Sequence, residues 1–231
     1  MWRAQLEGEP ESLEKLRKNF KNYIVLEDDN YYLKCPQFET EEENLLSFAE
    51  EVLENMINIL DFNLEEKCIA NLQGTFENIR NHGKDVIIAI PTARANAKGS
   101  SPSITIDGKT LDPDIVNEDL EKSLKCITNN VHIKLALEYY NGCNKHNLAF
   151  NLYTILEIIG EDLGSKNNIY EELNISRNKF RMLTRTLNYG LGNKSRHYNH
   201  NHPPATFYSE AEVKSLVKNI LKEWFGKKCL N

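Results

Sequence analysis

The sequence predicts an α+β protein. An N-terminal part with a small mixed sheet and helices, residues 1–112, is followed by a C-terminal all-α helical bundle, residues 113–231. Two observations support this. Short β-type runs separated by turn residues occur before residue 113, and helical spacing of apolar residues dominates after it. The chain, with 231 residues and 40% hydrophobic content, can bury a core, and no apolar run reaches the ~18 residues of a membrane span.

The first part begins with alternating strand and helix signals. Trp2–Glu7 is predicted to be a short strand, which Gly8-Glu9-Pro10 ends before a short helix that starts near Ser12. The β-type runs Tyr23–Leu26 and Tyr31–Leu33 flank a short acidic stretch and therefore predict a hairpin.

A long amphipathic helix is predicted next. Thr40 and Glu43 have the spacing of a capping box, and apolar residues follow at helical spacing. After this helix, residues 65–80 favour a strand, Asp85–Pro91 is predicted to be a buried strand, and a further strand is expected within Arg94–Ile106.

The second part is predicted to be helical to its end. The expected helices cover 117–127, 131–140, 148–163 and 176–187, and a last helix starts at the capping box of Ser209 and Glu212. A polar loop rich in Gly, Asn, His and Pro, residues 188–206, precedes that last helix.

Charge is distributed unevenly along the chain. Residues 1–66 hold 17 acidic and 6 basic residues, whereas residues 174–209, the acid-free segment, contain no Asp or Glu. The candidate nucleic-acid-binding residues of this segment are Arg177, Lys179, Arg181, Arg185 and Lys194. A local positive surface of this kind suits phosphates, including a nucleic acid backbone. The alternative is that these bases pair with the acidic N-terminal part in the fold.

The polar loop contains the strongest candidates for chemistry, Arg196, His197 and His202. Arginine binds phosphate oxygens, and histidine exchanges a proton near neutral pH. Together they could cleave RNA without a metal, with a histidine moving a proton at the 2′-hydroxyl or the leaving oxygen while Arg196 stabilises the phosphorane charge. Glu157, which shares a helix face with Tyr153, is a candidate to orient the arginine or a histidine. The alternative is a polar loop whose histidines cap helices or face water.

No metal or cofactor is expected. His197, His200 and His202 offer three imidazole ligands, but the adjacent Pro203-Pro204 and the lack of nearby acidic residues argue against a metal site. The five cysteines are scattered and form no C-x-x-C pair, which argues against a zinc ribbon. Because the acidic N-terminus is unlike a signal peptide, we expect a cytoplasmic protein that has no membrane contact.

The C-terminal part resembles the HEPN superfamily of helical domains (higher eukaryotes and prokaryotes nucleotide-binding). The resemblance covers roughly residues 145–226. It rests on the helix with Asn151–Glu157, the helix with Lys179–Asn188, the short interval between Arg196 and His202, and the capped last helix.

This resemblance implies a metal-independent ribonuclease or an RNA-binding protein that acts as a homodimer, of the kind found in toxin and anti-phage systems. Since Pro203-Pro204 place His202 in a loop, His197 and His200 are alternatives for proton transfer. The alternative function is a non-catalytic module that binds a partner protein or a nucleotide. The start of the chain, Met1–Gly8, is similar to that of a widespread set of bacterial proteins, which implies no activity.

Overall fold

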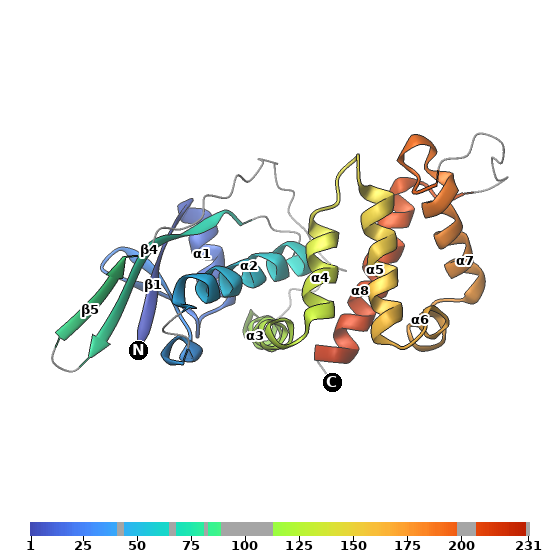
Figure 1. The fold of residues 1–231 in the computed structure, drawn as a ribbon. Helices are drawn as coiled ribbons and strands as arrows, with labels where there is room; N and C mark the ends of the chain where they lie inside the picture. Colours follow the sequence, from blue (N-terminus) through green and yellow to red (C-terminus); the bar gives the residue numbers. More distant parts are fainter. Residues whose placement is uncertain (41–43, 65–67, 81–82, 89–112, 198–206, 230–231) are drawn as a thin grey trace. The chain divides into compact units, whose positions relative to one another are not determined.

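The structure, a computed structural model, describes residues 1–40, 44–64, 68–80, 83–88, 113–197 and 207–229 (Figure 1). The fold is mixed α+β, as the sequence predicted, with an antiparallel sheet and several helices. The chain divides into two compact units, Met1–Thr128 and Asn129–Asn231.

The first unit contains a five-stranded sheet of order β2-β3-β1-β4-β5, in which every neighbouring pair is antiparallel. Its strands are β1 (Trp2–Gly8), β2 (Ile24–Glu27), β3 (Asn30–Lys34), β4 (Ala70–Arg80) and β5 (Gly83–Ile88). The predicted hairpin is β2–β3, and its two turn residues, Asp28 and Asp29, have φ of 48° and 61°. The strand expected within Arg94–Ile106 lies outside the described residues.

Helices α1 (Pro10–Asn19) and α2 (Leu45–Leu64) contact β1 and β4 of the sheet, respectively (Figure 1). A short turn, η1 (Pro36–Glu39), precedes α2. Successive side chains of a strand point to opposite faces, so Trp2, Ala4 and Leu6 share one face of β1, and all three are buried. The capping box expected at Thr40 and Glu43 falls partly on residues that the structure does not describe.

A buried arginine lies on β1 between these apolar positions. Arg3 Nε and Nη2 donate to Oε2 of Glu77, at 3.0 and 2.8 Å, and its Nη1 also pairs with Glu27. The Arg3 guanidinium carbon is 3.8 Å from the ring centroid of Tyr32. A buried charge is costly unless it is paired and hydrogen-bonded, so these contacts explain how Arg3 is accommodated inside the first unit.

The two compact units divide at a different residue from the one at which the sequence pattern changes. The sequence predicted a division between residues 112 and 113, where helical patterns take over, whereas the units divide after Thr128. Helix α3 (Pro113–Asn129) therefore lies almost wholly in the first unit. The backbone N and the Nδ2 of Asn22 donate to the carboxylate of Glu121 on α3, at 3.3 and 2.8 Å.

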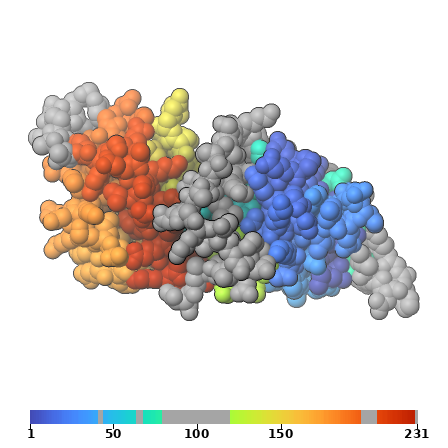
Figure 2. Space-filling model, turned by 180° about the vertical axis from the view of Figure 1, so that it is seen from behind, coloured from blue at the N-terminus to red at the C-terminus, as the bar shows by residue number. Residues whose placement is uncertain are grey.

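The second unit is described as helices and short helical turns. These are α4 (Val131–Asn141), α5 (Leu148–Asp162), α6 (Lys166–Glu172), α7 (Arg177–Arg185), η3 (Thr186–Gly190), η4 (Gly192–Lys194) and α8 (Glu210–Cys229). Helix α5 contacts α4, α6, α8 and η3, so it is central to this unit. Figure 2 shows α8, in red, forming much of one face of the unit. The helices expected at 131–140, 148–163 and 176–187 are confirmed, and α6 was not predicted.

Local hydrogen bonds explain where the helices of this unit start and stop. The predicted capping box of α8 is confirmed, because Ser209 N donates to Glu212 Oε2 at 2.7 Å and Glu212 N donates to Ser209 Oγ at 3.3 Å. Gly164, at φ 81°, follows α5 in a left-handed conformation that favours glycine.

A carboxylate joins three helices of the second unit. Asp162 at the end of α5 accepts a hydrogen bond from Trp224 Nε1 at 2.9 Å and pairs with Lys228 Nζ at 2.8 Å, both on α8. His132 Nδ1 on α4 is 3.7 Å from the other carboxylate oxygen. Burial alone would raise the pKa of Asp162, but the hydrogen bonds and charges of Lys228, Trp224 and His132 lower it.

None of the described helices is long and apolar enough to cross a membrane.

Candidate functional site

Arg196 and His197 are held against the end of α7 by backbone hydrogen bonds. Arg196 N donates to the carbonyl of Leu187 at 3.0 Å, and His197 N donates to that of Asn188 at 2.8 Å. Leu187 belongs to η3 and is fully buried. The two candidate residues therefore have a fixed backbone although they lie outside any helix.

The turn η3 anchors the chain on both sides of residues 198–206. It is a π-helical continuation of α7, a local geometry that often marks functional sites. Buried Thr186 accepts a hydrogen bond from Tyr208 N at 3.3 Å. Phe207 lies directly over Gly190, where a Cβ atom would come within 2.4 Å of the aromatic ring. Only glycine at position 190 leaves room for this contact.

The side chain of Arg196 contacts two residues of α5. Its guanidinium carbon is 4.2 Å from the ring centroid of Tyr153, within the range of a cation–π interaction. Its Nη1 is 3.8 Å from Glu157 Oε1, at the long end of ion-pair distances. The structure thus brings Glu157 and Arg196 together, and the orienting role of Glu157 stays a prediction.

A third charged residue, Lys166, joins this group, although the sequence did not predict its presence there. Lys166 Nζ is 3.0 Å from Glu157 Oε1, the same oxygen that Arg196 approaches, and 3.4 Å from the hydroxyl of Tyr153. It also lies 4.7 Å from the Tyr153 ring centroid. Two cations therefore share one carboxylate and one aromatic ring.

Gly160 explains how Lys166 reaches this position. It lies within α5, where glycine normally weakens a helix by about 1 kcal/mol relative to alanine. A Cβ atom at position 160 would be 2.9 Å from Cγ and 3.2 Å from Cα of Lys166. The start of α6 can therefore approach α5 closely. A glycine inside a strongly apolar helix pattern was the one sequence signal that could have indicated this packing.

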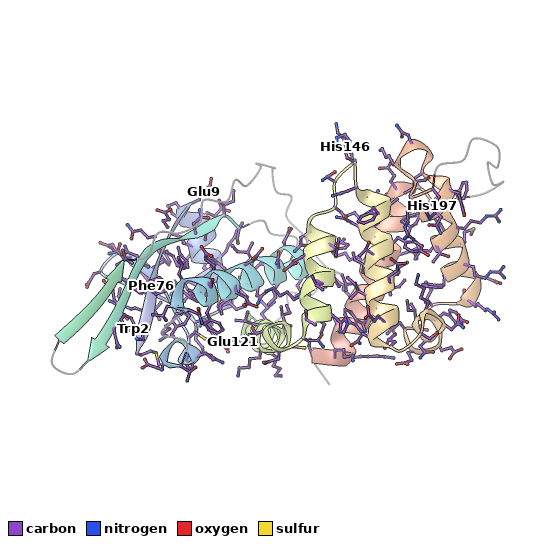
Figure 3. The ribbon with its side chains drawn as sticks, viewed as in Figure 1. Trp2, Glu9, Phe76, Glu121, His146 and His197 are labelled. Carbon is purple, nitrogen blue, oxygen red and sulfur yellow. The ribbon has the colours of Figure 1, made fainter. Side chains whose placement is uncertain are left out.

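His197 is exposed, and its ring centroid is 6.3 Å from that of Tyr189 on η3. Figure 3 labels His197 beside α7. His200 and His202 lie outside the described residues, so neither is placed next to Arg196. Among the residues that the structure covers, no three His, Cys, Asp or Glu side chains gather as metal ligands.

Helix α7 carries four of the five candidate nucleic-acid-binding residues, and all four are exposed. Arg177, Arg181 and Arg185 are four residues apart and form one stripe, while Lys179 lies to the other side of the buried face. Figure 1 shows α7 at the edge of the second unit, separated from α4 by α5.

Two partners modify this basic surface. Lys194 Nζ is 2.6 Å from Glu210 Oε1 at the start of α8, so a carboxylate offsets the charge of the fifth candidate. The guanidinium carbon of Arg177 is 5.8 Å from the ring centroid of Tyr170, an aromatic contact that leaves its charge intact. The stripe of Arg177, Arg181 and Arg185 therefore keeps its three positive charges.

No known protein family, curated protein or solved structure matches this chain. The functional assignment accordingly depends on the residues of this chain.

Proposed function

We propose that the second unit is a HEPN-like helical bundle that binds RNA and cleaves it without a metal ion. By the same resemblance, the protein acts as a homodimer in a toxin or anti-phage system. One observation carries the proposal. A half-buried arginine, Arg196, is fixed by its backbone and by α5, directly next to the exposed His197 and close in sequence to the basic helix α7.

The residues support a division of labour. The exposed bases of α7 attract the RNA backbone by charge, without reading the sequence. Arg196 then binds the phosphate at which cleavage occurs. Because guanidinium donors form paired hydrogen bonds to phosphate oxygens, Arg196 is suited to the charge that builds up in the phosphorane.

The proposed reaction needs only groups of the chain and of RNA. The 2′-hydroxyl oxygen attacks the adjacent phosphorus and loses its proton, while the bond to the 5′-oxygen breaks and that oxygen gains a proton. His197, the described histidine that adjoins Arg196 in the chain, can accept the proton of the 2′-hydroxyl and return a proton to the 5′-oxygen. The products carry a 2′,3′-cyclic phosphate and a 5′-hydroxyl.

The test is incubation of the purified full chain with RNA in EDTA, beside Arg196→Ala, His197→Ala and the control Lys145→Ala. Lys145 is an exposed lysine of the same unit that lies outside the candidate site. We expect wild type and Lys145→Ala to cleave and to leave cyclic phosphate ends, and Arg196→Ala to lose cleavage. Equal cleavage by wild type and Arg196→Ala would refute the assignment.

One observation favours the alternative function, a non-catalytic module that binds a nucleotide or a partner protein. Arg196 and Lys194 each already face a carboxylate, which reduces the positive charge next to His197. The same experiment separates the two functions. RNA binding that depends on α7 without any cleavage would support the binding module.

A further inference from the structure

Lys166 and Arg196 approach a single carboxylate oxygen from different parts of the second unit. Lys166 is the first residue of α6, and Arg196 follows η4. Their nitrogens lie 3.0 and 3.8 Å from Oε1 of Glu157. Two positive charges face one negative charge, so the group keeps an excess positive charge.

The geometry of these contacts matches what two cations offer to a phosphate. A carboxylate oxygen and a phosphate oxygen are both anionic acceptors that arginine and lysine bind through charge-assisted hydrogen bonds. Glu157 therefore holds the position that a phosphate oxygen of a ligand would take between the two cations. Because Arg196 Nη1 is 3.8 Å from Glu157 Oε1, too far for a hydrogen bond, a phosphate oxygen that binds this nitrogen displaces only a weak contact.

All three charged side chains are at least partly exposed to solvent. The exposed fractions are 45% for Lys166, 40% for Glu157 and 29% for Arg196. Exposed ion pairs contribute little to stability, so exchange of the carboxylate for another anion costs the fold little. The cations are nevertheless not freely mobile, because Tyr153 contacts both and Gly160 lets α6 pack closely on α5.

We propose that Lys166 and Arg196 form a phosphate-binding clamp, the Lys166–Arg196 clamp, which Glu157 occupies as a phosphate mimic when no ligand is bound. The ligand is a phosphate group of RNA. Lys166 becomes a phosphate-contacting residue, and Glu157 competes with the ligand. This deepens the proposed function, because it names a second cation for the phosphate that Arg196 binds.

The first experiment uses inorganic phosphate, so that its result does not depend on RNA cleavage. The full chain is labelled with ¹⁵N, and the Nε–Hε signals of its arginines are followed by NMR at neutral pH. The signal that disappears in Arg196→Ala identifies Arg196. Arg3, buried and paired with Glu77 in the first unit, provides an internal control whose signal should not move.

We expect phosphate to shift the Arg196 signal of the wild type. In Lys166→Ala the affinity should fall about fivefold or more, Lys166→Arg should restore most of it, and Lys145→Ala should match the wild type. Glu157→Gln should bind phosphate about fivefold more tightly, because it removes the competing charge while retaining the shape of the side chain. The proposal would be overturned if phosphate leaves the Arg196 signal of the wild type in place. It would also be overturned if Lys166→Ala and Lys145→Ala bind phosphate with equal affinity, or if Glu157→Gln binds phosphate more weakly than the wild type.

The second experiment replaces phosphate by an RNA oligonucleotide with 2′-O-methyl groups, which lacks the attacking hydroxyl. The same order of affinities among the variants supports RNA as the source of the phosphate. Binding of phosphate but not of this RNA would retain the clamp, reject RNA as its ligand and count against the proposed function. If the wild type gives the expected result in both titrations but does not cleave RNA, that outcome would count only against the catalytic step.

Discussion

The guanidinium carbon of Arg196 lies 4.2 Å from the ring centroid of Tyr153. This contact connects a residue outside the helices to the central helix α5. A cation over an aromatic face keeps much of its hydrogen-bonding capacity, because the ring uses none of the N–H donors. Tyr153 can therefore orient Arg196 and leave its donors available for a phosphate.

Replacement of Tyr153 by an aliphatic residue should reduce RNA cleavage without abolishing it, because Arg196 would be less well oriented. We expect Tyr153→Leu to reduce RNA cleavage about three- to tenfold, as expected for the loss of a cation–π interaction. Tyr153→Phe keeps the ring and should retain most of the activity. Initial cleavage rates of the two variants provide the measurement. Equal rates for Tyr153→Leu and Tyr153→Phe would show that the ring does not orient Arg196.

The stripe on α7 should determine how RNA binding responds to salt. If Arg181 neutralises one phosphate, Arg181→Ala should reduce the slope of log affinity against log salt concentration by about 0.7 for single-stranded RNA. Lys145→Ala removes the same charge from another exposed position of the unit and should leave the slope unchanged. Fluorescence anisotropy of a labelled oligonucleotide at several salt concentrations measures both. Identical slopes for the two variants would remove α7 from the interface.

The two glycines within long helices of the second unit should respond oppositely to alanine. Gly160→Ala places a Cβ atom against Lys166 and should lower the free energy of unfolding by about 1 kcal/mol or more. No atom lies within 4 Å of the Cβ position at Gly226, so Gly226→Ala should raise that free energy by about 0.5 kcal/mol through helix propensity. Urea unfolding curves check both signs. Stabilisation by Gly160→Ala would mean that α6 does not pack this closely on α5.

The contribution of Asp162 should depend on pH. Folding lowers the pKa of this carboxyl below its ordinary value of 3.8, so its stabilising effect is present above that value and is lost as pH falls through the lower folded pKa. Asp162→Asn should cost about 1–3 kcal/mol of unfolding free energy near pH 7, since Lys228 loses a charged acceptor. Urea unfolding of both proteins from pH 7 to pH 3 should show this difference shrinking at the acidic end. A difference that stays constant with pH would contradict the assigned role.

Local patterns in the sequence were sufficient for most elements. The spacing of Ser209 and Glu212 predicted the start of α8, because a capping box forms between residues three apart in the chain. The β2–β3 hairpin and helix α5 were also predictable, because their patterns likewise involve residues that are close together in the chain. Tyr153 and Glu157 were likewise assigned to one helix face from their spacing alone.

The domain boundary and the short helix α6 required more than local pattern. From residue 113 on the sequence pattern is helical, and this pattern predicts secondary structure only. The boundary between the units depends instead on which other elements each helix packs against. Helix α3 is bonded through Glu121 to Asn22, and no spacing rule connects residues so distant in the chain.

Residue spacing alone places Tyr153 and Glu157 on one face of α5, and the sequence also shows that residues 174–209 contain no acid and that Arg196 precedes His197. Which cations meet Glu157 depends on the packing of α5 against the segments that follow it. The turn after α5 and the space at Gly160 direct Lys166 back along the helix, and backbone bonds to η3 direct Arg196 toward it. Such contacts depend on chain direction and close packing in three dimensions, which residue periodicity does not encode.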